Sequence, residues 1–109
     1  KNLNKWMRPK KVKTPLTLLG TNSYIKSEAR GVVLIIAPWN YPFQLALNPL
    51  VAAIAAGNVA IVRPSEKTPH TGLVIERIIN EVFDSNIVSV VRGEIEASKI
   101  LLERLLTLK

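Results

Sequence analysis

Two loops of the sequence carry side chains whose types and spacing could do chemistry. In the first, residues 37–42, two prolines bracket Trp39, Asn40 and Tyr41. Because proline stiffens the backbone, such a loop can aim the Asn40 amide at one point, as an oxyanion hole requires. Asparagine is also a common turn residue, and composition alone favours that simpler interpretation.

The second loop places Arg63 and Glu66 on either side of Pro64 and Ser65. A carboxylate can accept hydrogen bonds from ribose hydroxyls in a nicotinamide-cofactor site, and a guanidinium can donate to a hydroxyl or a phosphate. The alternative is a surface ion pair of little energetic weight. Taken on its own, the loop favours that alternative.

The chain of 109 residues contains no cysteine and a single histidine, His70. A disulfide, a cysteine nucleophile and the usual zinc sites are therefore not expected within it, and no metal site is predicted. His70 has no acidic or thiol partner nearby in the sequence, so we expect it to face solvent at the start of a helix. A cysteine-free sequence also fits a cytoplasmic location.

Three apolar runs rich in β-branched residues predict the strands that position these loops: residues 32–36, 59–62 and 87–91. The first two runs do not alternate with polar residues, which is typical of strands covered on both faces of a parallel sheet. Ligands bind beyond the carboxyl ends of the strands in such sheets. Both loops lie at such ends, and Arg92-Gly93 follows the third run.

The gaps between these runs predict crossover helices. Residues 43–56 are apolar on nearly every side, so we expect an almost wholly buried helix that Pro49 kinks or splits and Gly57 ends. A second helix starts at Thr68-Pro69 and carries apolar residues with helical periodicity from Val74 to Phe83. A third spans about residues 94–106. The prediction is an α/β fold with a partial parallel sheet of three βα units.

The N-terminal part of the chain differs in composition from the rest. Residues 1–13 hold six basic residues and no acid, whereas the remainder is nearly neutral within a net charge of +7. A solvated leader is favoured over nucleic-acid binding, because the segment has one aromatic residue, Trp6, and no recognised motif. Residues 16–19 and 24–25 predict two short strands of a β-hairpin arm.

The apolar content is high for a chain of this length. Apolar residues make up 48% of the sequence, more than 109 residues can easily bury, which suggests a missing neighbour. The longest apolar run, residues 32–39, is nevertheless well short of the ~18–20 residues of a membrane span. The N-terminus also lacks the apolar region of a signal peptide. No membrane segment is predicted.

In their order along the chain, these loops resemble the aldehyde dehydrogenase superfamily. The similar stretch runs from Gly31 to Pro69 and contains the Pro38–Pro42 loop, the Ala55–Asn58 turn and the Pro64–Glu66 loop. The Asn-Tyr form of the first loop is most similar to the class 3 and fatty-aldehyde branch. The glycine-rich dinucleotide fingerprint is absent. The resemblance implies a partial Rossmann-like dinucleotide-binding domain in residues 28–109, after a basic segment and hairpin arm in residues 1–27.

The resemblance also implies an activity and its residues. The family oxidises aldehydes to carboxylic acids with NAD or NADP, by means of a cysteine thiolate and a glutamate-activated water. Asn40 would donate its amide hydrogen to the oxygen of the thiohemiacetal intermediate, which makes it the catalytic candidate. The hairpin arm would serve in subunit assembly, so a homo-oligomer is expected. The cofactor-binding candidates are Ile36, Ala37, Pro38, Trp39, Arg63, Ser65 and Glu66.

Departures from the family qualify these expectations. The family usually has lysine where this chain has Arg63, which leaves the choice between NAD and NADP open. The resemblance ends near Leu102, before the family's cofactor-binding glycine turn, its glutamate and its cysteine. We therefore interpret the chain as a fragment and predict no aldehyde oxidation by it alone. The alternatives are a residual nucleotide-binding module or a self-associating structural module, with nucleic-acid binding through the basic segment the least favoured.

Overall fold

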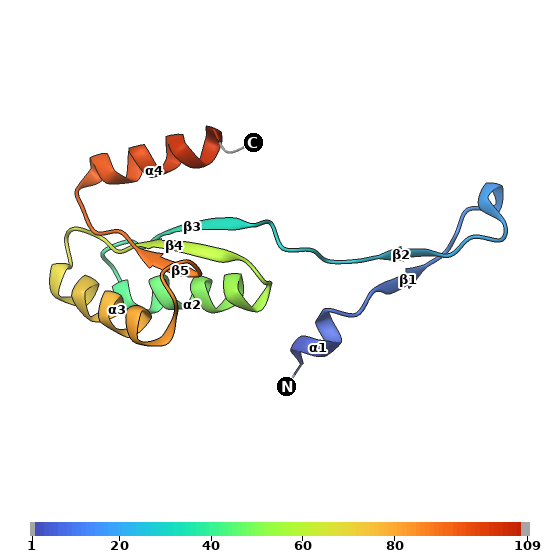
Figure 1. Ribbon diagram of the computed structural model, residues 1–109, viewed down its shortest axis with the longest axis horizontal. Helices are drawn as coiled ribbons and strands as arrows, with labels where there is room; N and C mark the ends of the chain where they lie inside the picture. Colours follow the sequence, from blue (N-terminus) through green and yellow to red (C-terminus); the bar gives the residue numbers. More distant parts are fainter. Residues whose placement is uncertain (1, 108–109) are drawn as a thin grey trace.

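A parallel sheet with helices on both faces forms the C-terminal part of the chain, and a two-stranded arm extends away from it (Figure 1). The computed structural model describes residues 2–107. The sheet order is β3-β4-β5, and both neighbouring pairs run parallel, as predicted. The elements of this part are β3 (Val32–Ile36), α2 (Pro42–Ala55), β4 (Val59–Arg63), α3 (Pro69–Val82), β5 (Val88–Val90) and α4 (Ile95–Thr107).

The helices divide between the two faces of the sheet. Because β3, β4 and β5 follow one another across the sheet, the two crossover helices α2 and α3 lie on the same face. Helix α4 lies on the opposite face and contacts β3 (Figure 1). The loops after the three strands therefore meet at one edge, on the left of Figure 1, and the arm leaves from the opposite end of β3.

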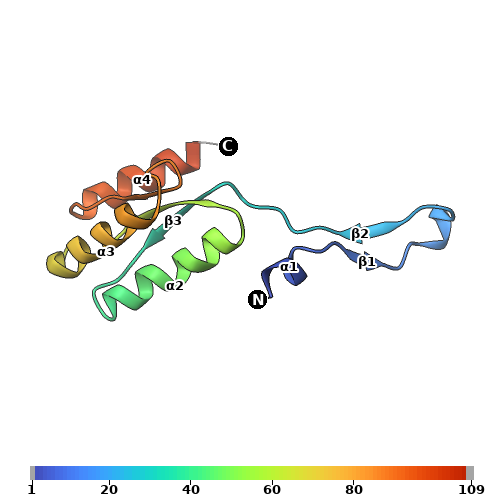
Figure 2. The same cartoon turned by 60° about the horizontal axis from the view of Figure 1, so that its bottom comes forward.

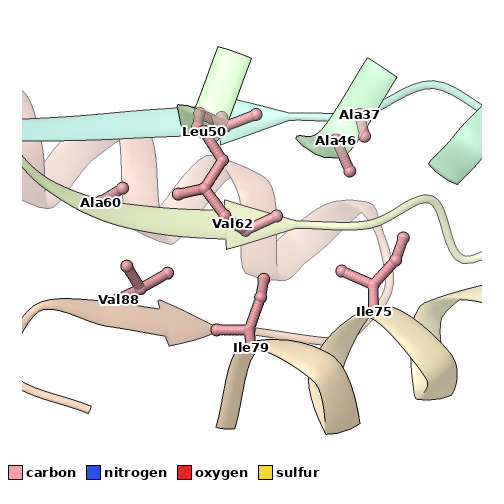
Figure 3. Packing of buried hydrophobic residues seen from close by; sticks show 9 residues of the cluster. Ala37, Ala46, Leu50, Ala60, Val62, Ile75, Ile79 and Val88 are labelled. Carbon is pink, nitrogen blue, oxygen red and sulfur yellow. The ribbon is translucent and has the colours of Figure 1, made fainter. Parts of the chain in front are cut away.

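The core lies between the sheet and helices α2 and α3 (Figure 3). Alternate residues of β4, Ala60 and Val62, are buried toward this layer, as the two-residue repeat of a strand requires. From α3, Ile75 and Ile79 are buried one helical turn apart. Leu50 of α2 completes the contact between helix and sheet. This packing fixes the position and direction of each strand, and therefore the point at which the loop after it begins.

Helix α2 differs from its prediction in two ways. It runs without interruption through Pro49, because proline removes a single backbone donor and the helix stays anchored to the core at Ala46, Leu50 and Ala53. It is also not wholly buried: these three residues are its buried ones, and Val51 on its outer side is 68% exposed.

The turn from α2 into β4 depends on Gly57 and Asn58. Gly57 has a φ of +83°, a left-handed conformation that glycine adopts without steric cost and that ends the helix. The buried Asn58 side chain then accepts a hydrogen bond from the Gly31 N–H at 3.0 Å and donates one to the Ala53 carbonyl at 3.1 Å. Asn58 thus ties the start of β3 to the end of α2, a role that the sequence analysis did not assign.

The hairpin arm exists, but its first strand was predicted in the wrong place. Strand β1 (Lys10–Val12) pairs antiparallel with β2 (Ser23–Ile25), and a short helix, α1 (Leu3–Trp6), precedes them (Figure 2). The predicted strand residues Leu16–Leu18 instead form a 3-10 turn, η1. Pro15 starts this turn, and its carbonyl accepts the Leu18 N–H at 2.9 Å. The prediction from apolar residues alone therefore placed the first strand in the wrong segment.

No helix in residues 2–107 combines the length and the apolar character needed to cross a membrane. The boundary near residue 27 between the arm and the α/β part stays a prediction.

Candidate functional site at the carboxyl edge of the sheet

The loop after β3 begins inside the core and ends at the surface. Ala37 is buried, and its N–H donates to the Arg63 carbonyl at 2.9 Å, which extends the β3-β4 ladder by one residue. Pro38, Trp39 and Asn40 are exposed beyond it. Trp39 is 60% exposed, so it is not a core aromatic in this chain. The loop therefore projects from a fixed point at the carboxyl edge.

Tyr41 connects this loop to helix α2 in an unusual conformation. Its φ of 48° and ψ of 49° are left-handed, and it is the only residue other than glycine with positive φ among residues 2–107. Pro42 follows as the first residue of the helix, a position that proline favours. This left-handed residue is the N-cap of α2. Asn40 thereby stands just before the helix rather than within its first turn.

Replacing Tyr41 with glycine should stabilise the chain relative to replacing it with alanine. Both changes remove the exposed side chain, but only glycine adopts the left-handed conformation without steric cost. We expect the glycine variant to exceed the alanine variant in free energy of unfolding by about 1 kcal/mol, measured by urea titration. Equal stabilities of the two variants would mean that the residue does not hold this conformation in solution.

The Asn40 carboxamide is exposed and makes no hydrogen bond to any other group in residues 2–107. The buried Asn58 is the opposite case, because both of its polar atoms are bonded within the fold. A short polar side chain in a turn usually bonds to its own backbone. Asn40 does not, so its N–H donors remain available to a bound molecule.

The loop after β4 contains a buried arginine. Nη2 of Arg63 lies 2.7 Å from Glu66 Oε2 and donates to the Gly93 carbonyl at 2.9 Å. The ion pair that the sequence offered as the alternative is present, but Arg63 is only 4% exposed, so its arginine is buried rather than at the surface. Within the described chain, Nε of Arg63 is buried and has no partner. Arg63 thus links the loop after β4 to the loop after β5.

Ser65 shapes the same loop. Its buried Oγ accepts the Lys67 N–H at 3.2 Å, and its carbonyl accepts the Thr68 N–H at 3.2 Å. These bonds turn the chain toward the start of α3, where His70 is exposed as predicted. Glu66 is left at the surface of the loop, with its side chain 30% exposed.

A hollow of about 200 Å³ lies between the loops that follow β4 and β5. Pro64, Pro69 and Gly72 give it apolar walls. Charged groups stand among its lining residues, and Arg92 is held by Glu76 through an Nε to Oε2 distance of 2.6 Å. The full lining is Pro64, Ser65, Glu66, Pro69, Gly72, Arg92, Gly93 and Glu94. An apolar wall with a carboxylate beside it fits the adenosine part of a nicotinamide cofactor.

The predicted site residues fall into two groups at one edge. Ser65 and Glu66 line the hollow, and Arg63 reaches it through Glu66 and Gly93. The second group follows β3 and does not line the hollow: Ile36, Ala37, Pro38, Trp39 and Asn40. Sequence reasoning missed the contribution of Gly72 from α3. Among residues 2–107, no cluster of three or more His, Asp or Glu residues could hold a metal ion.

The Glu66 carboxyl is biased toward its ionised form. Its pKa lies below the ordinary value of 4.5, first because of a hydrogen bond from its own backbone N–H and second because of the Arg63 guanidinium. Partial desolvation opposes these effects without reversing them. Glu66 is therefore an anion and a hydrogen-bond acceptor at neutral pH.

Glu66→Gln should destabilise the chain at neutral pH but not in acid. A carboxyl whose pKa is lowered by folding adds stability above its unfolded pKa, and this stability disappears as the pH falls through the folded pKa. The stability difference between the wild type and the variant should therefore shrink as the pH falls below 4.5. Thermal unfolding across pH measures it. Glu81→Gln, which removes an exposed ion pair, is the control; a pH-independent Glu66→Gln effect would contradict the ionic contribution.

Known proteins are similar in sequence to this chain. A family model described as "Aldehyde dehydrogenase family" matches residues 3–105. The 4,4'-diaponeurosporen-aldehyde dehydrogenase of Staphylococcus aureus is 56% identical over 102 residues, which cover 94% of this chain and 22% of that protein. Aldehyde dehydrogenase family 3 member H1 of Arabidopsis thaliana is 40% identical over 104 residues, covering 95% of this chain and 22% of that protein.

Solved structures share the fold. A substrate-bound Staphylococcus aureus AldH superposes with a TM-score of 0.88 at 56% identity, over 92% of this chain and 22% of that one. An NAD-dependent benzaldehyde dehydrogenase from Corynebacterium glutamicum gives a TM-score of 0.70 at 28% identity, over 84% of this chain and 20% of that one. The chain therefore spans little more than a fifth of the proteins that it resembles.

Proposed function

Since the chain belongs to the aldehyde dehydrogenase family, we propose that it supplies the cofactor edge and one catalytic donor of an NAD(P)-dependent enzyme that oxidises an aldehyde to a carboxylic acid. The observation that carries the proposal is Asn40, whose exposed amide has no partner in residues 2–107. It stands on a loop fixed at Ala37 and at α2. A preorganised donor of this kind is what an oxyanion requires.

The catalytic role of Asn40 is to stabilise negative charge. Addition of the family's cysteine to the aldehyde carbonyl places a developing negative charge on the aldehyde oxygen. The Asn40 side-chain N–H donates to that oxygen, and the stiff loop means that little reorganisation is needed as the charge develops. The nicotinamide cofactor, when bound, supplies the hydride acceptor.

We propose that the loops after β3 and β4 both bind the cofactor. The Glu66 carboxylate accepts hydrogen bonds from the adenosine ribose, and Ser65 supports it by shaping the loop. Ile36, Pro38 and Trp39 are exposed beside the edge, which leaves them free to contact a bound cofactor. Ala37 is buried, so it contributes backbone rather than side chain.

The isolated chain should not oxidise aldehydes. It contains no cysteine, so the nucleophile of the family's reaction is absent from it. A chimera provides a test: residues 3–105 replace the matching segment of the staphylococcal relative. We expect the chimera to reduce NAD or NADP in an aldehyde-dependent reaction and the isolated chain to show none. A folded but inactive chimera would contradict the proposal.

Self-association is a second proposed property, because α3 leaves an apolar stripe uncovered. Val74, Ile78 and Val82 lie one turn apart and are 51%, 36% and 67% exposed. Such a surface favours contact with another chain, in line with the homo-oligomer expected from the resemblance.

The cytoplasmic location is proposed on the cysteine-free composition alone.

Light scattering at increasing concentration should show a mass above the 12.1 kDa of the monomer. Replacing Val74 and Val82 together with lysine should shift the mass toward the monomer, because two charges would have to be buried in the contact. A mass of one chain at all concentrations would contradict self-association.

A further inference from the structure

The far end of the arm carries three strongly exposed leucines. In the turn that joins β1 to β2, Leu16, Leu18 and Leu19 are 83%, 53% and 82% exposed (Figure 1). We propose that this turn inserts into the surface of an anionic lipid bilayer and that the basic strand behind it binds the phospholipid headgroups. This interaction goes beyond the proposed function and does not depend on the cofactor edge.

The backbone of the turn satisfies much of its own hydrogen bonding. The Leu18 carbonyl accepts the Thr21 N–H at 3.2 Å and the Thr21 hydroxyl at 2.8 Å. The Pro15 carbonyl accepts the Leu18 N–H at 2.9 Å, and Pro15 itself has no N–H to satisfy. Because an unpaired polar group is most costly in hydrocarbon, these bonds lower the cost of moving the turn into lipid.

The segment on both sides of the turn is basic. Residues 2–27 contain no aspartate or glutamate, and their basic residues are Lys5, Arg8, Lys10, Lys11, Lys13 and Lys26. All of these basic residues are exposed. Lys13 lies three positions before Leu16, so its alkyl stem can follow the leucines into the apolar layer while its ammonium stays among the headgroups. The charge of the segment therefore complements a surface of anionic phospholipid.

Strands β1 and β2 place an aromatic ring beside a cation behind the turn. Tyr24 pairs with Lys11 across the two strands, so both side chains lie on one face, and Tyr24 is 63% exposed. Tyrosine favours the depth of a bilayer at which hydrocarbon meets the headgroups. Along the arm, an apolar turn is thus followed by basic and aromatic strands and then by the α/β part (Figure 2). This order matches that of hydrocarbon, headgroups and water.

Two other partners would use only part of this surface. A nucleic acid would bind the cations but leave the leucines in water. Contact between two copies of the arm would cover the leucines, but it would bring two basic segments together. A bilayer that contains anionic lipid accommodates both features.

Co-sedimentation of the 109-residue chain with vesicles tests the proposal. We expect binding to equimolar phosphatidylglycerol and phosphatidylcholine to be at least about tenfold tighter than binding to phosphatidylcholine alone, and added salt should weaken it. Leu16→Ser combined with Leu19→Ser should weaken binding by about tenfold or more, because the turn loses its apolar contact with the bilayer. The matched control combines Leu102→Ser with Leu106→Ser, which alters two exposed leucines of α4 and should leave binding unchanged.

A single fluorescent label reports insertion of the turn directly. Because the chain has no cysteine, Thr17→Cys provides one labelling site within the turn, and Asn48→Cys provides one on α2 as the control. With anionic vesicles, the label at position 17 should emit at a shorter wavelength and become shielded from a quencher dissolved in the water. The label at position 48 should show neither change.

Several outcomes would overturn the proposal. These are equal binding to both kinds of vesicle, full binding by the Leu16 and Leu19 double variant with native circular dichroism, and tighter binding to a DNA duplex than to anionic vesicles. A label at position 17 that is shielded without vesicles would show that a second copy covers the turn, and one that stays in water on bound vesicles would show binding by charge alone. Either result would also overturn insertion. None of these outcomes alters the proposed function, which the chimera tests without vesicles.

Discussion

Replacing Asn40 with alanine in the active chimera should lower kcat by about 10²–10³-fold, the effect of removing one oxyanion donor. The loss should appear in kcat more than in KM, because the hydrogen bond strengthens as charge develops on the oxygen. The steady-state rate of cofactor reduction at saturating aldehyde measures kcat. The free energy of unfolding should change by no more than about 0.5 kcal/mol, because the exposed Asn40 side chain has no partner in residues 2–107.

Asn48→Ala is the matched control for this prediction. Asn48 is an exposed asparagine in the second turn of α2, outside the loop. The Asn48→Ala substitution should leave kcat unchanged. If Asn40→Ala kept full activity, or lost activity only through unfolding, Asn40 would be a turn residue without a catalytic role.

Ile79→Ala should lower the free energy of unfolding of the chain by about 2–5 kcal/mol, as expected for a large aliphatic residue removed from a core. Ile79 is 1% exposed and packs between α3 and the sheet (Figure 3). Urea unfolding followed by circular dichroism measures the change. If the variant is unfolded in water, Ile79→Val gives the same comparison with an expected loss of about 0.5–1.5 kcal/mol.

Val82→Ala on the same helix provides the comparison for Ile79→Ala. Val82 is 67% exposed, so in dilute solution, where the chain is a monomer, its replacement should cost less than about 0.5 kcal/mol. Similar losses at both positions under these conditions would contradict the packing described for α3. At higher concentration the loss at Val82 should grow, because self-association buries this position.

The sheet could be predicted from the sequence because its strands are short, β-branched and separated by gaps of crossover length. The arm was harder, because each of its strands has three residues and Lys10–Val12 carries no apolar alternation. Helix burial was overestimated for a different reason. Residues 43–56 are apolar on nearly every side, but only the presence of a neighbour decides whether a given side is covered, and Val51 is 68% exposed.

The two loops of the site could also be found from sequence, but their internal geometry could not. The buried Arg63 donates to the Gly93 carbonyl, a contact between residues 30 positions apart. The left-handed Tyr41 gives no signal in the sequence, since tyrosine does not favour that conformation. Asn58 could have been suspected as a polar residue between a helix-ending glycine and an apolar strand.

The proposed function requires that this chain carries a working cofactor edge and oxyanion donor of an aldehyde dehydrogenase. Its most direct test is the aldehyde-dependent reduction of cofactor by the chimera with the staphylococcal relative, compared with its Asn40→Ala variant at equal concentration and equal stability. We expect activity in the chimera and a loss of about two to three orders of magnitude in the variant. An inactive folded chimera, or equal rates for the two proteins, would contradict it.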